Sequence, residues 1–341
     1  MTDTFTIKDA IAKLVERADL SGAEAATCMA EMADGAATPA QVGAFLVALR
    51  MKGETADEMT GLLRVMRERA RSVVVDGTVL DTCGTGGDGS SSFNVSTCAA
   101  FVAAGAGARV AKHGNRAVTS KCGSADVLES LGAKIELSPE QVAACIERAG
   151  IGFMFAPAFH PAMKHVGPSR REIGVRTVFN LVAPLANPAG ASRQVVGVPR
   201  IDLVETIAAV LRQSGTDRAL VVHGDDGFDE VSISGPTTVG ELAGGEVRMY
   251  RIAPEDVDLP CHDIVYLRGG TPEQNATELR LVLDGTPGPL RDFTLINAAA
   301  ALSAYGIAAN MRAGVALAAE SIDSGAARAK LEAFVEATNN V

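Results

Sequence analysis

The sequence predicts an α/β protein in which a small all-helical region precedes a larger region with a mainly parallel central sheet. Residues 1–72 show only helical periodicity and helix-start patterns. From residue 73 onwards, short β-branched runs alternate with helical segments. Such alternation is typical of a parallel sheet that carries helices on both faces. The chain has 341 residues, and this length suits about two domains.

Helical periodicity begins at once, because Ile7, Ile11 and Leu14 would share one face of a helix. Further along, a hydroxyl residue is followed three positions later by Glu or Gln, which is the pattern of a capping box. The pairs are Ser21 with Glu24, Thr38 with Gln41, and Thr55 with Glu58. We therefore expect about four helices. Their apolar faces would pack either on the rest of the chain or on a second copy of it.

Beyond residue 73, β-branched or apolar runs predict strands, and longer amphipathic or apolar segments between and after them predict helices. The candidate strands are 78–82, 108–112, 133–137, 152–156, 194–198, 218–224 and 246–252. The candidate helices are 96–106, 124–132, 138–150, 202–215, 293–306 and 313–325.

Composition sets bounds on location and partners. The formal net charge of −10 argues against a wide nucleic-acid surface, although a local basic pocket remains compatible with it. The apolar runs are too short to span a bilayer, and the N-terminus lacks the pattern of a signal peptide. The six cysteines include no C-x-x-C pair, which argues against a zinc site or a disulfide framework. We expect a cytoplasmic protein with reduced thiols and with neither nucleic-acid nor membrane partners.

A glycine-rich segment, DTCGTGGDGSSSFNVST at 81–97, follows one candidate strand and precedes a candidate helix. Ligands collect at that end of a parallel sheet, and glycines let the backbone approach them. The helix, capped by Asn94, Ser96 or Thr97, would offer its N-terminus to a phosphate or pyrophosphate. The spacing matches neither a P-loop nor a dinucleotide fingerprint, which argues against an NAD-dependent dehydrogenase. By itself, the segment leaves a flexible Gly/Ser turn open.

The next candidate strand runs into a segment rich in cations and hydrogen-bond donors. Its charged or titratable members are Lys112, His113, Arg116 and Lys121. Its polar members are Asn115, Thr119, Ser120 and Ser124. In an acidic chain, this concentration beside a glycine loop favours a pocket for a polyanion over ordinary surface charge.

Two later segments bring further candidates. Arg170, Arg171 and Arg176 offer planar forks that suit a carboxylate, whereas His160 and His165 are expected to be packed or capping residues. The acidic residues Asp225, Asp226, Asp229 and Glu230 follow a buried candidate strand. Carboxylates beside a pyrophosphate imply an intervening Mg²⁺ ion. We expect Asp225 and Asp226 to belong to a solvated turn, and both Asp229 and Glu230 to reach metal only if the backbone turns there or two ions bind.

Together, four ordered segments resemble the anthranilate phosphoribosyltransferases. They are GTGGDGSSSFNVST at 84–97, KHGNRAVTSKCGSADVLESLG at 112–132, GPSRREIGVRTVFN with PLANPA at 167–189, and HGDDGFDE at 223–230. The resemblance extends through the helical N-terminus and the NAAAAL segment at 297–302, and so covers nearly the whole chain.

This resemblance implies a nucleoside-phosphorylase-like phosphoribosyltransferase architecture. A helical domain at 1–72, joined by about 165–185, would pack beside an α/β domain formed by 73–164 and 186–341. The helical domains would form a homodimer. The implied reaction, part of tryptophan biosynthesis, joins anthranilate to the phosphoribosyl group of 5-phosphoribosyl 1-pyrophosphate (PRPP) and releases pyrophosphate. The implied cofactor is Mg²⁺.

The resemblance also implies roles for individual residues, with no distinct catalytic base. The PRPP site would comprise Gly84, Gly87, Asp88, Ser92, Asn94, Val95, Ser96, Thr97, Lys112, His113, Gly114, Asn115, Arg116, Ala117, Val118, Thr119, Ser120 and Ser124. The anthranilate site would comprise Gly84, Asn115 and Arg170, with Arg170 facing the carboxylate. The metal ligands would be Ser96, Asp229 and Glu230.

Some positions depart from the family pattern. Ala183 replaces a common Gly near the anthranilate tunnel, Cys122 replaces a common Ser, and Thr119 replaces a usual Ser. Two related alternatives share the fold: a pyrimidine nucleoside phosphorylase, which would use inorganic phosphate, and a non-catalytic nucleic-acid binder. The arginines after residue 167 and the pair Asp229–Glu230 favour the transferase, and the negative net charge argues against the binder.

Overall fold

In the computed structural model, which describes residues 5–87, 89, 92–117 and 121–341, the chain begins with helices only. They are α1 (Ile7–Val15), α2 (Gly22–Ala33), α3 (Pro39–Lys52) and α4 (Ala56–Glu68). The side chains of Ser21, Thr38 and Thr55 each accept a hydrogen bond from the backbone three residues on, as the capping patterns predict. The helix starts were therefore readable from local sequence.

The central sheet has seven strands in the order β3-β2-β1-β4-β5-β6-β7. Its strands are β1 (Leu80–Gly84), β2 (Val110–Gly114), β3 (Ile151–Phe155), β4 (Arg193–Gly197), β5 (Arg218–Gly224), β6 (Thr237–Ala243) and β7 (Glu246–Ile252). Strands β1 to β5 pair in parallel, whereas β6 and β7 are antiparallel additions at one edge. The prediction of a mainly parallel sheet is confirmed.

Two strand predictions fail for different reasons. Residues 133–137 alternate between buried and exposed, like a strand, but they form an extended connection outside the sheet. There the backbone N–H of Lys134 donates to the Thr338 hydroxyl at 3.2 Å. Strand β6 was missed, because Gly240 and Glu241 interrupt its apolar pattern. Gly240 is needed where the strand packs on α11 (Asp202–Gln213), since an added Cβ would lie 3.0 Å from Cγ1 of Val204.

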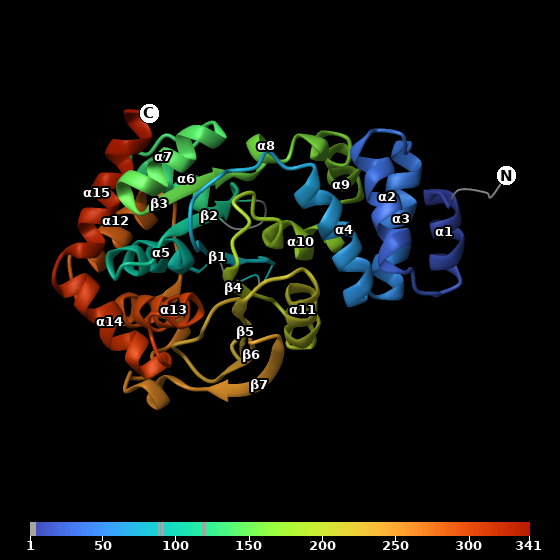
Figure 1. Cartoon of the computed structure of the whole chain (residues 1–341). Coiled ribbons are helices and arrows are strands. Elements are labelled where there is room, and N and C mark those ends of the chain that lie inside the picture. Colours follow the sequence, from blue (N-terminus) through green and yellow to red (C-terminus); the bar gives the residue numbers. More distant parts are fainter. Residues whose placement is uncertain (1–4, 88, 90–91, 118–120) are drawn as a thin grey trace.

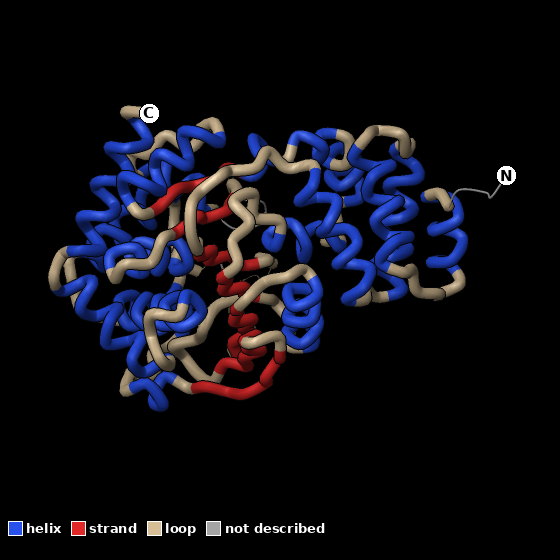
Figure 2. Tube along the Cα trace, viewed as in Figure 1, coloured by secondary structure: helices blue, strands red, loops and turns tan. Residues whose placement is uncertain are grey.

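Helices cover both faces of the sheet, which stands as a column between them (Figure 2). On one face, α5 (Val95–Gly105) and α13 (Pro289–Tyr305) contact strands β1 to β5. On the other face, α7 (Pro139–Ala149) contacts β3, and α11 contacts β5 and β6. The outer elements α6 (Ser124–Ser130), α12 (Pro272–Leu283), α14 (Met311–Asp323) and α15 (Ala326–Asn339) complete this region.

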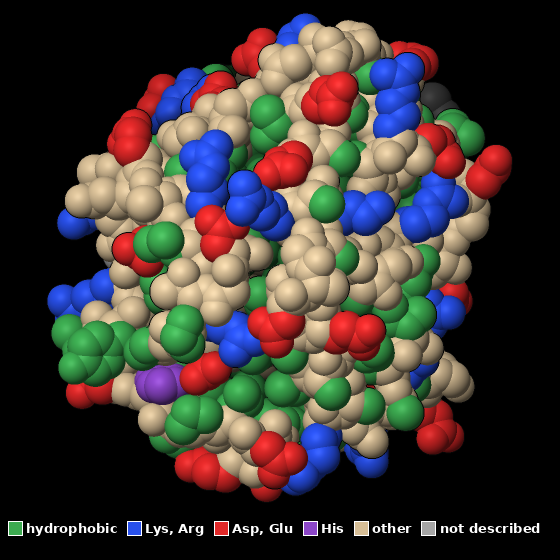
Figure 3. All heavy atoms as spheres, turned by 90° about the vertical axis from the view of Figure 1, so that its left-hand side faces the viewer, with side chains coloured by type: hydrophobic (Ala, Val, Ile, Leu, Met, Phe, Trp, Pro, Cys, Tyr) green, Lys and Arg blue, Asp and Glu red, His purple; other side chains and the backbone are tan. Residues whose placement is uncertain are grey.

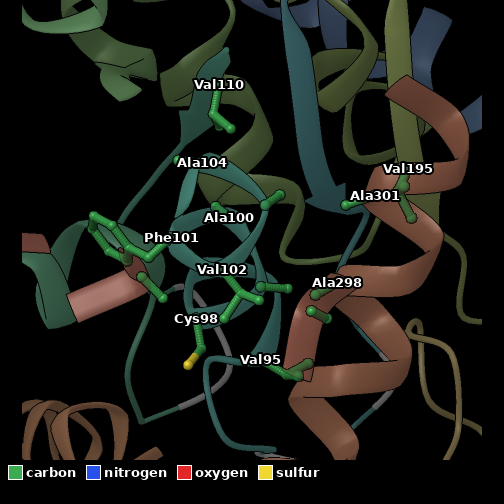
Figure 4. Packing of buried hydrophobic residues seen from close by; sticks show 14 of the residues in the cluster. Val95, Cys98, Ala100, Phe101, Val102, Ala104, Val110, Val195, Ala298 and Ala301 are labelled. Atoms are coloured by element: carbon green, nitrogen blue, oxygen red, sulfur yellow. The ribbon is translucent and has the colours of Figure 1, made fainter. Parts of the chain in front are cut away.

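Small side chains bring α5, α13 and α14 close together. Figure 4 shows Ala298 and Ala301 of α13 beside α5, whose first turn carries Val95. An added Cβ at Gly314 of α14 would lie only 2.8 Å from the Cα atom of Ala299. The alanine-rich run at 297–302 is therefore a packing surface, and it fixes α5 firmly behind the glycine-rich segment.

After β3, the chain crosses to the N-terminal helices and returns (Figure 1). This crossing contains α8 (Ala156–Phe159), a 3-10 helix (Pro161–Lys164), α9 (Gly167–Ile173), α10 (Val178–Val182) and a second 3-10 helix (Ala183–Leu185). Helix α9 contacts α3, and α10 contacts α3 and α4. Buried Val178 and Phe179 share one apolar core with the N-terminal helices and α11. The domain limits at residues 72, 164 and 186 stay predictions.

The described surface carries charges of both signs (Figure 3), and the cysteines are free thiols. Basic and acidic side chains are interspersed over the face that carries α12, α14 and α15 (Figure 3). Within the described ranges, every helix is either too short or too polar to cross a membrane. All six cysteines lie in those ranges as free thiols, and five of them are buried.

Candidate active site

A cavity of about 400 Å³ opens at the carboxyl ends of β1, β2 and β5. It is lined by fifteen of the predicted site residues: Gly84, Gly87, Ser92, Asn94, Ser96, Lys112, His113, Gly114, Asn115, Arg116, Ala117, Ser124, Arg170, Asp229 and Glu230. The chain thus brings together segments that lie up to 146 residues apart, from Gly84 to Glu230. Four further predicted residues, Asp88, Val118, Thr119 and Ser120, lie outside the described residues.

Two predicted residues do not line the cavity. Val95 and Thr97 occupy the first turn of α5, and their side chains are buried. The Thr97 hydroxyl has no hydrogen-bond partner among the described residues. Among the other candidates, Lys121 and Arg171 are exposed and lie outside the cavity lining. For Val95, Thr97 and Arg171, helical rotation, which sequence patterns place with low precision, decides the difference. Lys121 lies in the connection between β2 and α6.

The glycine loop packs directly against the carboxylate of Asp229, which follows β5 in the chain. The backbone N–H of Gly86 donates to Oδ2 of Asp229 at 2.7 Å. A Cβ added at Gly84 would lie 2.4 Å from the same oxygen. Gly86 and Gly87 both have positive φ, at 65° and 81°, a conformation that favours glycine. The glycines therefore serve close approach as well as turning.

Lys112 lines the cavity, and its side chain is buried and hydrogen-bonded to neighbouring residues. Its ammonium donates to the carbonyl of Thr82, and its Nζ lies 3.5 Å from the Ser96 hydroxyl. Burial lowers the pKa of Lys112, and the negative charge of Asp81 opposes that shift. Burial raises the pKa of Asp81 to about 6, while Lys112 works in the opposite direction. Each group therefore stabilises the charged form of the other.

Asp81 was not among the predicted residues, although it starts the glycine-rich segment. Its side chain is fully buried. It accepts hydrogen bonds from the backbone N–H of His113 at 3.1 Å and from Nδ2 of Asn187 at 2.7 Å. Asn187 also donates to the carbonyl of Ala111 at 2.8 Å. Residues from two distant segments therefore hold the strand that carries Lys112. In the sequence, the only indication of this role is that Asp81 lies in a strand next to the one that carries Lys112.

Two buried histidines remain neutral beside the cavity. The ring centroids of His113 and His160 lie 5.1 Å apart. Burial lowers the pKa of His113 to about 3 and that of His160 to about 4. The Nε2 atom of each ring lacks a hydrogen-bond partner within the described part of the chain. The expectation that His160 is packed agrees with its burial, whereas His165 is exposed, with its ring beside Gly35.

Arg170 and Arg176 supply the cationic wall, from the segment that crosses to the N-terminal helices. The Arg170 guanidinium lies 5.3 Å from the ring centroid of Phe179, and burial lowers its pKa. Nη2 of Arg170 donates to Oδ1 of Asn180 at 3.5 Å. Nη2 of Arg176 donates to the carbonyl of Thr85 at 2.8 Å. Phe179 and Asn180 also line the cavity, and sequence reasoning missed both, although they end the arginine motif.

Arg116, the remaining basic residue of the cavity lining, is held by contacts within the protein. Arg116 forms ion pairs with Asp126 and Glu129 on α6. Its guanidinium also lies 5.5 Å from the ring centroid of Phe155. Two positions that depart from the family pattern, Cys122 and Ala183, line the cavity as well.

The acidic segment at 225–230 has two parts: Asp225 and Asp226 make contacts within the protein, whereas Asp229 and Glu230 line the cavity. Asp225 is exposed and pairs with Arg251. Asp226 is more than a solvated turn residue, because it accepts from the hydroxyls of Ser232 and Ser234. Strand β5 ends at Gly224, and Asp229 and Glu230 follow on an irregular segment. The backbone therefore turns there, so both carboxylates line one cavity.

These oxygen donors fit a magnesium ion held jointly by protein and ligand. Mg²⁺ prefers carboxylates, phosphates and water, and it is usually bound through one or two carboxylates. Asp229 and Glu230 supply two carboxylates, and the Ser96 hydroxyl lines the same cavity. Within the described residues, no cluster of three or more His, Cys, Asp or Glu side chains forms a complete metal cage.

Comparison with known proteins gives one consistent family. Residues 76–328 match the model of the glycosyl transferase family, a/b domain, and residues 8–70 match that of its helical bundle domain. The anthranilate phosphoribosyltransferase of Moorella thermoacetica is 56% identical over 330 residues, covering 96% of this chain and 97% of the relative. That of Symbiobacterium thermophilum is also 56% identical, over 336 residues and 98% of both chains.

Solved structures agree over the whole length. The crystal structure of anthranilate phosphoribosyltransferase from Thermus thermophilus has a TM-score of 0.92 and 44% identity, and the match covers 97% of this chain and 99% of that chain. The Saccharomyces cerevisiae enzyme in complex with PRPP and Mg has a TM-score of 0.89 and 29% identity, with 98% of both chains covered.

Proposed function

Because this chain belongs to the anthranilate phosphoribosyltransferases of the glycosyl transferase family, we propose that its cavity transfers the 5-phosphoribosyl group of PRPP to the amine of anthranilate. The bond from ribose C1 to the pyrophosphate oxygen breaks, and its electron pair leaves with pyrophosphate. A bond from C1 to the amine nitrogen forms, and the nitrogen loses a proton. The product, N-(5-phosphoribosyl)anthranilate, is an intermediate of tryptophan biosynthesis.

One observation carries this proposal: a single cavity joins an anion cradle to a half-buried arginine wall. The glycine loop, Ser96 and Lys112 suit a polyphosphate. Arg170 and Asn115 suit the carboxylate of an aromatic acid. Mg²⁺ bound at Asp229 and Glu230 would supply charge neutralisation for the leaving pyrophosphate. A neutral arylamine is already nucleophilic, so the remaining task of the protein is to hold it in line with C1.

The direct test follows the loss of anthranilate fluorescence in the presence of PRPP and Mg²⁺, together with pyrophosphate release. Metal-dependent loss with stoichiometric pyrophosphate would establish the reaction and show that Ala183 is compatible with anthranilate. A folded protein that binds PRPP but leaves anthranilate unchanged would assign the acceptor to another amine or base. Cleavage of a pyrimidine nucleoside by inorganic phosphate would instead support the phosphorylase alternative.

Replacing Arg170 with alanine is expected to weaken anthranilate recognition selectively. Loss of a charge-assisted fork at this half-buried site corresponds to about a 10- to 100-fold increase in the KM for anthranilate. The KM for PRPP should change little, because the guanidinium contacts Phe179 and Asn180, whereas Arg176 is the arginine that donates to the glycine loop. Steady-state kinetics with each substrate varied in turn would measure both constants. Arg171→Ala, next in sequence but exposed, is the control, and an unchanged KM for anthranilate in R170A would contradict the assignment.

We further propose a homodimer formed through the N-terminal helices. Val15 at the end of α1 and Met51 at the end of α3 are 65% and 70% exposed, and α1 contacts α3. Large exposed apolar side chains on neighbouring helices are typical of an interface. Met51→Glu should therefore shift sedimentation-velocity profiles from dimer to monomer, whereas Met249→Glu on β7 should not. A wild-type chain that sediments as a monomer at micromolar concentration would contradict the dimer.

A further inference from the structure

A buried asparagine on α12 reaches the glycine-rich segment from far along the chain. Asn275 is 2% exposed. Its Nδ2 donates to Oδ1 of Asn94 at 2.7 Å, although 181 residues separate the two. Its Oδ1 accepts from the backbone N–H of Gly270, also at 2.7 Å. Both ends of the Asn275 amide are therefore engaged, and one of them holds a residue of the cavity wall.

The backbone around Asn275 is shaped for this contact. A Cβ added at Gly269 would lie 2.6 Å from the carbonyl oxygen of Ser92 and 3.0 Å from Nδ2 of Asn275. Ser92 also forms an isolated antiparallel bridge with Arg268. The backbone N–H of Phe93 donates to the carbonyl of Leu267 at 2.9 Å. The segment before α12 thus lies directly against residues 92–94.

Asn94 also contacts the connection between β2 and α6, which is the second loop that lines the cavity. Its Nδ2 donates to the carbonyl of Cys122 at 3.2 Å. Asn94 occupies the N-cap position of α5, yet its side chain makes no capping hydrogen bond. By contrast, Ser21, Ser138 and Thr271 cap their own helices. The Asn94 side chain is therefore turned away from the end of α5, towards Asn275 and Cys122.

This orientation has a consequence for anion binding. A capping asparagine would satisfy one of the free N–H groups at the start of the helix and compete with a phosphate for it. In the structure the N–H groups of Thr97 and Cys98 donate to the carbonyl of Asn94 at 3.1 Å. With the Asn94 side chain held elsewhere, the N–H of Ser96 stays available to a ligand in the cavity, which Asn94 and Ser96 line. We propose that Asn275 is a positioning residue that holds Asn94 between the two loops and keeps the N-terminus of α5 open to the phosphoribosyl donor.

This inference rests on the proposed function, and its test separates the two substrates. Asn275→Leu keeps the side-chain volume but removes both hydrogen bonds. We expect its Kd for PRPP, measured by calorimetry with Mg²⁺, to rise about tenfold. The KM for PRPP should rise in parallel, while kcat and the KM for anthranilate stay within about twofold. Asn275→Asp, which keeps the acceptor for Gly270 but loses the donor to Asn94, should show the same selective loss.

Gln274→Leu is the matched control. Gln274 is the neighbouring residue, it is exposed, and its side chain accepts from the backbone N–H of Thr271 at 2.9 Å. The control should lose some thermal stability and keep its affinity for PRPP. If wild type and both Asn275 variants bind PRPP within twofold of one another, the positioning role is overturned and the proposed function stands. A parallel decline of both substrate affinities and the melting temperature would overturn it too, because that pattern marks a purely structural residue. A wild-type chain that fails to bind PRPP would instead overturn the proposed function.

Discussion

Asp229→Asn is expected to lower kcat/KM by about a thousandfold at fixed Mg²⁺ concentration. The substitution keeps the shape of the side chain, and an amide oxygen can still accept from the N–H of Gly86, which lies 2.7 Å from Oδ2 in the wild type. What it removes is the negative charge that, in the proposed reaction, attracts a divalent cation beside the pyrophosphate. Steady-state kinetics over a range of Mg²⁺ concentrations would measure the loss. Calorimetric titration of PRPP with and without the metal would separate weaker binding from slower chemistry.

The control for this variant lies four residues earlier. Asp225 is exposed and pairs with Arg251, so Asp225→Asn should leave activity within about twofold. Asp226 is unsuitable as a control, because it accepts from the hydroxyls of Ser232 and Ser234 and so shapes the same segment. A folded Asp229→Asn variant with wild-type kinetics and an unchanged Mg²⁺ requirement would show that this carboxylate holds no ion.

Lys112→Met should lower kcat/KM by a few hundredfold, because in the proposed reaction it removes a buried positive charge that stabilises the leaving pyrophosphate. Methionine fills much of the same space, so the loss reflects charge more than volume. The variant should also be less stable, since the charge of Asp81 would remain fully buried without its counter-charge. Single-turnover kinetics and thermal melting would record the two effects separately.

A second substitution distinguishes catalysis from folding at this position. In the double variant Lys112→Met with Asp81→Asn, the unpaired buried charge is gone, so melting should recover in part while activity stays low. Recovery is not complete, because the asparagine keeps one acceptor oxygen where Asp81 accepts from both His113 and Asn187. Lys121→Met is the surface control, because Lys121 is exposed and outside the cavity lining. Recovery of activity along with stability in the double variant would show that Lys112 serves the fold alone.

Short-range chemistry made much of this fold predictable. The pairs Ser21–Glu24 and Thr55–Glu58 mark helix starts because each capping bond forms within three residues. Strand β5 is a buried β-branched run, and its character follows from composition alone. The glycine loop and Lys112 could be placed at one cavity for a topological reason: the carboxyl ends of parallel strands lie at the same edge of a sheet.

Where local pattern was ambiguous, the prediction failed. Residues 133–137 have the alternation of a strand, but no neighbouring strand lies beside them among the described residues, and their alternation reflects packing of a connection against the core. Strand β6 lacks clear alternation and is defined by its partners, β5 and β7. Strand identity is a property of pairing, and pairing partners are set by the whole sheet.

The residues of the proposed anion cradle could be predicted before any fold was known, because they lie in contiguous motifs such as those around Asn94 and Lys112. What holds those residues in place became visible only in the folded chain. Asp81 meets Asn187 across 106 positions, and Asn275 meets Asn94 across 181. A buried asparagine carries no local signature, since its hydrogen-bond partners are chosen by the crossing of distant elements. The residue types of the proposed site can therefore be read from short stretches of this sequence. The positions of their side chains depend on contacts between distant residues, which exist only after the chain has folded.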